Sequence, residues 1–397
     1  MDATLPLLIT LAAALLGAAY LAISFNLRGH RTLLGAGIGA AAGAVGVLFF
    51  MLPLNWCTFD PERNPIDAAF GLLLIGLGMA AALSLARWLS FALIERRLTL
   101  GARPPGAFKG WLTPVLLLAP TLVVLALFLY YPSLDTFRLS TLLIRLGNPR
   151  SAFVCVNNFT RLAGDADYLN SVVTTISISI AIVVIGLVLS LLIATLAYQP
   201  IKGAAFYRTL LIWPYAISPA VAGVIFLLLF NPTGGIINYA LSNVLGIQIP
   251  WLNNPTFAPW AVIIASVWKS LGYNILFYLA GLQNVPKDLL EAASIDGANA
   301  VQRYISVVIP LLSPITFFLI ITNMTYAFFD TFGTIDYLTG GGPLKSTTTM
   351  MYNIYVVGVR NNDLGKAAAE SIILFVMVIG LTIFQFRTAG QRVSYGA

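Results

Sequence analysis

Hydrophobic positions along this chain come in long unbroken runs, separated by short connections that hold most of the charged residues. A hydrocarbon core of about 30 Å is crossed by a helix of roughly 20 apolar residues, and windows of that length recur along the whole sequence. The pattern predicts an all-α polytopic membrane protein with about nine transmembrane helices. The expected spans are Thr4–Phe25, Thr32–Leu54, Asp67–Leu89, Trp111–Tyr131, Ser171–Tyr198, Thr209–Phe230, Ala258–Leu282, Leu311–Ile335 and Glu370–Phe386.

Composition agrees with a membrane setting. Of the 397 residues, 59% are hydrophobic and 9% are charged, against about 25% charged in an average soluble domain. The mean hydropathy of +0.88 leaves too few polar groups for a normal solvated surface. Basic cytoplasmic loops explain the net charge of +7, so no nucleic-acid partner is expected.

Lysine and arginine in the short connections set the orientation, because cytoplasmic loops carry an excess of these residues. Their distribution places the C-terminus in the cytoplasm and the N-terminus outside. The connection after Tyr131 is expected outside although it carries several arginines; at about 40 residues it is long enough to obey the rule less strictly. The basic residues expected inside are Arg28, Arg31, Arg96, Arg97, Arg103, Lys109, Lys202, Arg208, Lys287, Arg303, Arg387 and Arg392.

A cleaved signal sequence is the alternative interpretation of the first apolar run, which contains the small residues Gly17-Ala18-Ala19. No basic segment precedes this run, Asp2 does, and the run is longer than the apolar region of a usual signal peptide. A membrane span is therefore favoured.

The chain is expected to divide near a loop rich in helix breakers. Gly101, Pro104, Pro105 and Gly106 punctuate a cytoplasmic linker at 95–110. Residues 1–94 would form an accessory bundle of three helices, and residues 111–397 a core of six. Small residues in the second span permit close helix packing, and this packing role is favoured over a part in transport. They are Gly35, Gly37, Gly39, Gly43 and Gly46.

A compact polar element lies between the seventh and eighth spans. Its sequence is Glu291-Ala292-Ala293-Ser294-Ile295-Asp296-Gly297. Pro286 can open a helix here, because the first turn does not need its missing N–H, and Gly297 can end it in a left-handed conformation. Small alanines fit a cleft, and Glu291 can accept charge-assisted hydrogen bonds from a basic partner. Docking of a soluble partner is favoured over a solvated helix in which Lys287 and Glu291 only pair with each other.

Several motifs resemble the permease subunits of ABC importers. Glu-Ala-Ala, three residues, Gly, nine residues, Val307, one residue, Ile309 and Pro310 has the spacing of their EAA loop, with Val307 and Ile309 where Ile and Leu are usual. The resemblance runs from Trp111 to Phe386 and is closest to the glycerol-3-phosphate permease branch of the carbohydrate-uptake (maltose-type) family. The other matching segments are Trp213–Ala222, Phe230–Pro232, Trp268-Lys269, Ala327–Phe332 and Thr339–Pro343.

The resemblance implies a type I ABC importer permease core of six helices whose loop 284–310 docks a soluble ATPase. The partners expected from it are a second homologous permease, two ATPase copies that hold ATP and Mg²⁺, an extracytoplasmic solute-binding protein and membrane lipid, in a bacterial or archaeal plasma membrane. No cofactor is expected on this chain. The three additional N-terminal spans depart from the six-span pattern, which leaves their role open. The implied docking residues are Glu291, Ala292, Ala293, Asp296, Gly297 and Pro310.

Ionisable residues inside two spans indicate the solute path. Lys269 lies near the centre of the seventh span, where a charge costs about 2.5–3.5 kcal/mol on insertion scales, so it must face protein, water or solute. Two helical stripes carry the candidates: Ser266, Lys269 and Tyr273 on the seventh span, and Asn323, Tyr326 and Asp330 on the eighth. A simple Lys269–Asp330 pair and solute contact are both open. A phosphate-bearing solute would keep Lys269 charged, and sugar hydroxyls would suit the tyrosines and asparagine equally well.

Residues for catalysis are scarce. The single histidine, His30, excludes a histidine pair for zinc and makes a serine–histidine arrangement untenable. The run Gly340–Ser346 superficially resembles a phosphate loop, but Leu344 stands where a glycine must precede the lysine. A tight turn capping the eighth span is expected instead, and the chain is not expected to be an enzyme.

The two cysteines, Cys57 and Cys155, are both expected outside, in an oxidising compartment where disulfides persist. They could bridge the accessory bundle to the core or remain two unpaired thiols. The sequence alone gives no distance between them.

The sequence is compatible with three functions to different degrees. The leading one is the permease subunit of an ABC importer for glycerol-3-phosphate, a glycerophosphodiester or a sugar, with maltose-type or trehalose-type permeases as close rivals. A secondary transporter without an ATPase would need broken spans in matching halves, and Pro214 and Pro219 break only one. A membrane enzyme is disfavoured for want of catalytic residues.

Overall fold

The computed structural model describes residues 4–27, 32–58, 76, 78–91, 112–147, 151–199 and 203–389. Contacts divide the chain into two compact units, Met1–Thr160 with Asp363–Ala369 and Arg161–Asn362 with Glu370–Ala397. The expected linker at 95–110 lies outside the described residues. The division into a bundle at 1–94 and a core at 111–397 therefore stays a prediction.

The first unit contains apolar helices and a short hairpin. A helix also covers residues 78–91. The two strands pair antiparallel, with Leu142 opposite Phe153. The elements are α1 (Thr4–Asn26), α2 (Thr32–Thr58), α4 (Leu112–Leu125), the π-helix η1 (Ala126–Tyr130), α5 (Tyr131–Ser140), β1 (Leu142–Leu143), β2 (Ala152–Phe153) and the start of α6 (Asn157–Ala163).

Glycines set the approach of α1 to α2. A Cβ atom on Gly39 would collide with the backbone of Gly17, and one on Gly43 with the backbone of Ala13. Gly35 lies against Leu21 and Phe25 of α1, and Gly46 against residues 78–82 of the next helix. Four of the five glycines singled out in the sequence thus serve close packing, while Gly37 faces open space.

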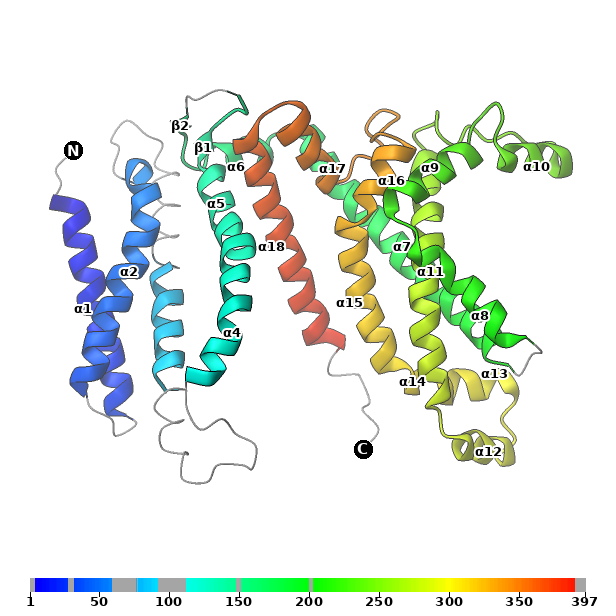
Figure 1. The fold of residues 1–397 in the computed structure, drawn as a ribbon, viewed down its shortest axis with the longest axis horizontal. Coiled ribbons are helices and arrows are strands. Elements are labelled where there is room, and N and C mark those ends of the chain that lie inside the picture. Colours follow the sequence, from blue (N-terminus) through cyan, green and yellow to red (C-terminus); the bar gives the residue numbers. More distant parts are fainter. Residues whose placement is uncertain are drawn as a thin grey trace. The chain divides into compact units, whose positions relative to one another are not determined.

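The second unit holds most of the remaining helices (Figure 1). Its elements are α7 (Ala166–Tyr198), α8 (Ala204–Ile212), the 3₁₀ turn η2 (Trp213–Ala216), α9 (Pro219–Leu229), α10 (Ile236–Leu245), α11 (Ala258–Gln283), α12 (Lys287–Ile295), α13 (Ala300–Arg303), the π-helix η3 (Tyr304–Val308), α14 (Ile309–Leu311), α15 (Ser313–Phe329), α16 (Thr331–Leu338), α17 (Met350–Tyr355), the π-helix η4 (Val356–Arg360) and α18 (Leu364–Ala389), whose first residues belong to the first unit.

Within the described residues, five helices are long and apolar enough to cross a membrane, or six if one bent pair counts as a span. They overlap the six spans predicted for the core, so the chain is a multi-pass membrane protein. The expected total of nine stays a prediction. The ranges are Leu116–Ser140, Ala166–Tyr198, Ala258–Gln283, Ser313–Leu338 and Leu364–Arg387, with Ala204–Ala216 and Pro219–Leu229 as the bent pair.

Several span boundaries differ from the prediction because polar residues extend the helices. α7 begins at Ala166 instead of Ser171, and α8 begins at Ala204 instead of Thr209. Past Tyr131 the helix continues to Ser140, where Arg138 and Asp135 form an i, i+3 ion pair at 2.8 Å. The last helix begins at Leu364 instead of Glu370. The side chain of Asp363 accepts a hydrogen bond from the backbone N–H of Lys366 and so caps that helix.

Two prolines bend the sixth predicted span. Ile217 is extended between η2 and α9, and the axes of the two halves differ by 101°. Pro219 opens α9 behind Ser218, whose side chain accepts the N–H of Val221. Because proline cannot donate to the preceding turn, the chain leaves the helix here and a break forms inside the membrane-spanning region.

α11 is the central helix of the second unit. In its most apolar window, 67% of the residues are buried, and α7, α8 and α15 pack around it. Gly272 lies against α8, where an added Cβ would meet the carbonyl oxygen of Ile212 at 2.6 Å. This contact fixes the distance between α11 and the bent pair.

We expect Gly272→Ala to lower the thermal unfolding midpoint of the purified protein, since overpacking against backbone costs about 1–3 kcal/mol. Gly380→Ala in α18 is the matched control, because nothing lies within 4 Å of its added Cβ and alanine should stabilise the helix by about 0.5–1 kcal/mol. Scanning fluorimetry in detergent compares the two. Equal unfolding midpoints for the two variants would show that α8 and α11 are not in close backbone contact at Gly272.

Candidate functional site

A polar cavity of about 480 Å³ opens beside the break in the bent pair. Its wall is formed by the break between η2 and α9, by α11, by α15 and by Asp330 between α15 and α16. Its volume is in the range of small-molecule sites. The lining residues are Tyr215, Ile217, Ser218, Pro219, Lys269, Ser270, Tyr273, Thr322, Asn323, Thr325, Tyr326 and Asp330.

Lys269 is the charged centre of this cavity. Its side chain is only 7% exposed, and its ammonium lies 5.5 Å from the ring centroid of Tyr215 and 5.2 Å from that of Tyr326. Cation–π contacts of this kind contribute about 2 kcal/mol or more when they are desolvated. The two rings therefore offset part of the cost of holding an ammonium in an apolar helix.

Asp330 lines the same cavity, with its side chain exposed. Among the ion pairs formed by described residues, none joins Lys269 to Asp330 within 4.0 Å. The simple pair considered from the sequence is therefore not formed in this structure. Both charges are available to a third group in the cavity.

Aromatic rings continue one wall of the cavity. Tyr215 and Tyr273 have ring centroids 5.3 Å apart, Tyr273 and Phe277 4.8 Å, and Phe277 and Phe318 5.1 Å. The row connects the bent pair through α11 to α15. These tilted ring contacts join the three segments through apolar packing.

Two buried amides join α11 and α15. Asn274 Nδ2 donates to Asn323 Oδ1 at 3.1 Å, and Asn323 Nδ2 donates to Asn274 Oδ1 at 2.6 Å. Asn323 also donates to the carbonyl oxygen of Leu319. A reciprocal pair satisfies both amides inside the protein, so Asn323 lines the cavity while its hydrogen bonds are largely used between helices.

Five of the six residues predicted for the solute path line this cavity: Lys269, Tyr273, Asn323, Tyr326 and Asp330. The exception is Ser266, which is fully buried one turn away and is not part of the lining. Sequence reasoning missed the contribution of the bent pair. Pro214 and Pro219 signal a break, but only the fold brings Tyr215 and Ser218 to α11.

The polar element between the seventh and eighth spans forms α12, as predicted. The helix begins directly after Pro286 and ends before Gly297, which has φ +82°. Ala298 N–H donates to the carbonyl oxygen of Ala293 at 3.0 Å, and Gly297 N–H donates to that of Ser294 at 3.1 Å. These bonds satisfy carbonyls at the helix end, the role of a left-handed glycine cap.

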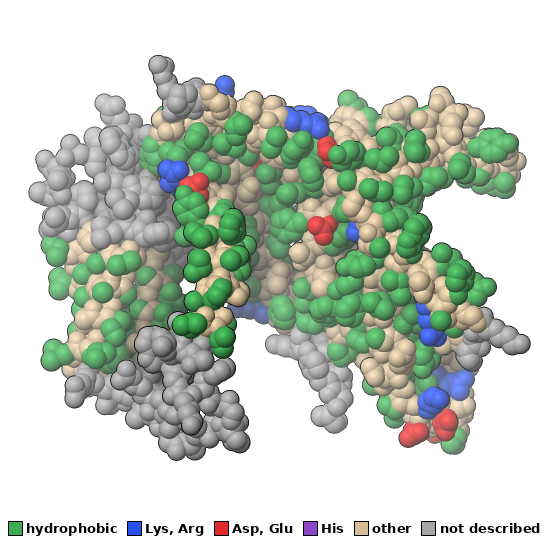
Figure 2. Space-filling view, in the orientation of Figure 1, with side chains coloured by type: hydrophobic (Ala, Val, Ile, Leu, Met, Phe, Trp, Pro, Cys, Tyr) green, Lys and Arg blue, Asp and Glu red, His purple; other side chains and the backbone are tan. Residues whose placement is uncertain are grey.

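α12 is open to a partner. None of its residues is buried, and the side chains of Glu291, Ala292 and Asp296 are exposed. No Lys287–Glu291 ion pair occurs among the described residues, so the alternative of internal pairing is not realised. Figure 2 shows charges of both signs gathered at this end of the second unit.

The rest of the loop ties α12 to the spans. Asn299 and Gln302 form a reciprocal capping box that starts α13. The hydroxyl of Tyr304 lies 2.6 Å from that of Thr195 on α7. Pro310 is exposed in α14, directly before α15. Exposed apolar side chains accompany the charges on this loop: Leu289, Ile295, Val301, Ile305 and Ile309.

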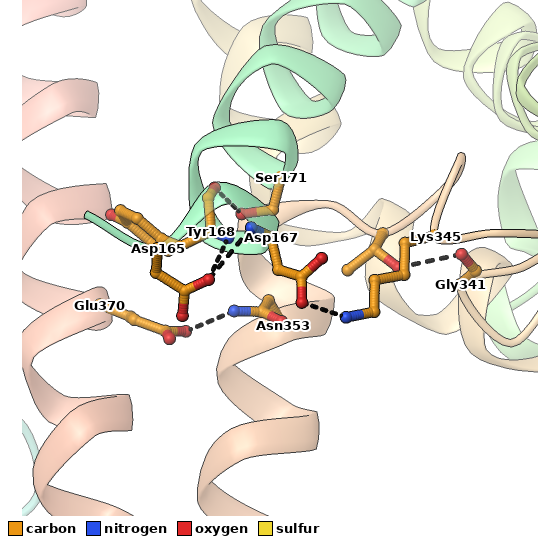
Figure 3. Close-up of polar contacts among 9 residues, drawn as sticks. Asp165, Asp167, Tyr168, Ser171, Gly341, Lys345, Asn353 and Glu370 are labelled. Atoms are coloured by element: carbon orange, nitrogen blue, oxygen red, sulfur yellow. Dashed lines mark hydrogen bonds and ion pairs between the residues drawn. The ribbon is translucent and has the colours of Figure 1, made fainter. Parts of the chain in front are cut away.

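A polar network closes the opposite end of the second unit (Figure 3). Lys345 forms an ion pair with Asp167 at the start of α7, and Asn353 donates to buried Glu370 on α18 at 3.0 Å. Thr348 donates to the carbonyl oxygen of Gly341. The segment Gly340–Ser346 is thus a turn after α16, as predicted, and the threonines that directly follow it hold it through hydrogen bonds to its carbonyl oxygens. Nothing in the sequence indicated that Glu370 would be buried.

A polar cavity among membrane spans, a bent span beside it and an exposed polar helix at one end define a membrane transport subunit. The chain belongs to the family of binding-protein-dependent transport system inner membrane components, which matches residues 166–389. The predicted assignment to the ABC importer permeases is confirmed, and the secondary transporter and membrane enzyme are set aside.

The sn-glycerol-3-phosphate transport system permease protein UgpA of Rhizobium meliloti is 44% identical over 289 residues, which cover 73% of this chain and 98% of that protein. The protein of the same name from Yersinia pestis bv. Antiqua is 45% identical over 291 residues, with the same coverage. These relatives are transport permease subunits. About a quarter of this chain has no counterpart in them.

The fold is similar to that of a bacterial alginate ABC transporter, solved in complex with an alginate pentasaccharide-bound periplasmic protein. The TM-score is 0.63 at 21% identity, and the alignment covers 72% of this chain and 96% of that one. At this identity the likeness concerns the fold alone.

Proposed function

We propose that this chain forms the transmembrane path of an importer for a small phosphate-bearing solute of the glycerol-3-phosphate type. The observation that carries the proposal is Lys269, a buried ammonium held between two tyrosine rings and facing a polar cavity. A phosphate oxygen would accept a charge-assisted hydrogen bond from it. The names of the relatives support the same solute class.

The other cavity groups suit the hydroxylated part of such a solute. Ser270, Thr322 and Thr325 add hydroxyls to the lining, and Tyr273 and Tyr326 add phenols. Asp330 can accept hydrogen bonds from solute hydroxyls. A neutral sugar would use these groups without needing Lys269, so the lysine separates the two solute classes.

Coupling to ATP is assigned to the loop 284–310. Glu291, Ala292, Ala293, Asp296, Gly297 and Pro310 would seat a separate ATPase that binds ATP and Mg²⁺, and this chain would not hydrolyse ATP itself. The exposed charges and apolar side chains of α12 to α14 support an interface of this kind. A second homologous permease and an extracytoplasmic binding protein would complete the importer.

The proposed topology keeps the N-terminus outside, the C-terminus in the cytoplasm and α12 in the cytoplasm. Residues 1–94 would be an accessory bundle outside the permease core, which is supported by the quarter of the chain that the relatives lack. Cys155 supports a link between bundle and core, because it is buried and disulfide-bonded. Its expected partner, Cys57, has a side chain outside the described part of the structure.

Uptake into proteoliposomes containing the whole importer tests the cavity. Lys269→Met should reduce sn-glycerol-3-phosphate uptake about 10- to 100-fold, because a hydrogen bond to a charged group contributes about 1.5–3 kcal/mol. Asp330→Asn should have a smaller effect, since the amide still accepts hydrogen bonds. The double variant should remain as impaired as Lys269→Met.

The controls for this experiment are the ATPase activity of each assembled complex and uptake of a neutral disaccharide. Recovery of uptake in the double variant would reduce Lys269 and Asp330 to a structural pair. Disaccharide uptake that is insensitive to Lys269→Met and exceeds sn-glycerol-3-phosphate uptake in the unmodified importer would assign the path to a sugar.

Charge reversal at Glu291 tests the coupling. Glu291→Lys should abolish co-purification of the ATPase with this chain, because a like charge against a basic cleft costs several kcal/mol in a packed interface. Glu291→Gln keeps the shape and should retain partial binding. Retention of the second permease in both preparations shows that the membrane part is intact. Normal ATPase recovery and uptake in Glu291→Lys would refute the docking proposal.

Mass spectrometry of the alkylated, non-reduced protein tests the proposed Cys57–Cys155 bridge. We expect one cross-linked peptide pair, and a lower unfolding midpoint in Cys57→Ser. A closed loop of about 100 residues is worth up to about 4.7 kcal/mol in the chain-entropy model, and the membrane already confines the spans. Two alkylated cysteines would exclude the bridge. Labelling of either cysteine by a reagent confined to the cytoplasm would overturn the topology.

A further inference from the structure

The short helix α10 is attached to the second unit by a buried polar side chain. Asn238 is buried: its Nδ2 donates to the carbonyl oxygen of Ile249 at 2.9 Å, and its Oδ1 accepts the N–H of Ile249 at 3.3 Å. Ile237 packs against the core, and the ring of Trp251 in the same connection packs at a tilt against that of Phe230, with centroids 4.9 Å apart. The inner side of α10 is therefore fixed to the second unit through both polar and apolar contacts.

The outer side of α10 is mainly apolar, with exposed Asn243 as its polar exception. Ile236, Tyr239 and Val244 are 68%, 71% and 79% exposed, and their spacing of i, i+3 and i+8 places them on one face of the helix. Leu245 at the end of the helix and Ile247 beyond it are exposed as well. Figure 2 shows this projecting part covered by hydrophobic side chains, without a charged side chain in view. On a helix whose outer side faces water, that side carries charged and polar residues.

The sequence around α10 is free of charge over a long distance. Residues 209–268 contain no Asp, Glu, Lys, Arg or His. Other segments at the same end of the second unit carry charged groups, including Asp167, Lys345 and Arg360. The stretch that includes α10 thus has the composition of a membrane segment, although α10 is too short to span.

The position of α10 fits the surface of a bilayer. Figure 1 shows it lying crosswise to α11, at the end of that helix opposite α12. α10 follows α9 after a turn at Asn231–Gly235. Val224 and Leu228 are exposed on α9, so an outward apolar surface continues from the span onto the crosswise helix. A helix crosswise to the spans at their end runs along the membrane surface.

We propose that α10 is an interfacial helix, whose face of Ile236, Tyr239 and Val244 lies at the boundary between lipid headgroups and acyl chains, in the leaflet opposite the α12 loop. Helices of this kind bury an apolar face in the boundary region, and tyrosine is enriched there because its ring is apolar and its hydroxyl is polar. This anchoring does not depend on the solute. The anchored α10 holds the C-terminal end of α9, while the N-terminal end of α9 at Pro219 borders the cavity.

Spin-label accessibility in the assembled importer, reconstituted in nanodiscs of phosphatidylethanolamine and phosphatidylglycerol, tests the proposal. Val244→Cys carries the label, with Ile236→Cys on the same face as a second site. Leu228→Cys is the reference for a lipid-facing span and Leu344→Cys the reference for an exposed loop. Protein without an added cysteine gives the background from Cys57 and Cys155, and co-elution with the partner subunits shows that each variant assembles.

A label at Val244 should collide with oxygen several-fold more often than with a water-soluble nickel complex. Its ratio should fall between those of Leu228→Cys and Leu344→Cys, as expected at the interface. A ratio equal to that of Leu344→Cys would place α10 in water. Low accessibility to both reagents would show that another protein surface covers it. Either result would overturn the proposal.

Discussion

An ammonium group inside a membrane span must be solvated by something other than lipid, and this constraint organises the second unit. Lys269 lies on the most buried of the spans, where water from the bilayer surface does not reach it without a cavity. The bent pair supplies that cavity and one of the two rings beside the ammonium, and α15 supplies the other. The break at Ile217 results from the prolines, and it also gives the ammonium of Lys269 its cavity and the Tyr215 ring.

The same principle explains why the break is tolerated. Irregular backbone at membrane depth is acceptable only where it is buried in protein or lines a polar cavity. Ser218 caps α9, Thr334 donates to the carbonyl oxygen of Pro219, and the residues of the break line the cavity. The irregular backbone and the ammonium of Lys269 therefore border the same cavity.

Much of this could be predicted from the sequence because the signals are local. Long apolar runs set the positions of α7, α11 and α18, and Pro286 and Gly297 set the limits of α12 through their own backbone preferences. The stripe of Lys269 and Tyr273 predicted one wall of the cavity. The opposite wall could not be predicted, because Tyr215 reaches Lys269 only after a bend of 101°. Glu370 likewise accepts a hydrogen bond from Asn353 of α17, a contact that forms only once the chain turns back between α17 and α18.

The reciprocal amide pair of Asn274 and Asn323 has a mechanical consequence. Sliding α15 along α11 by even one residue would break both hydrogen bonds and leave two amides unpaired in an apolar setting, so the pair resists such sliding. α11 leads into the loop 284–310, and α15 follows it, so both arms of the loop end in that body. If a partner displaces the loop, as proposed above, the expected result is a tilt of the pair that carries Lys269 and Asp330 together relative to Tyr215.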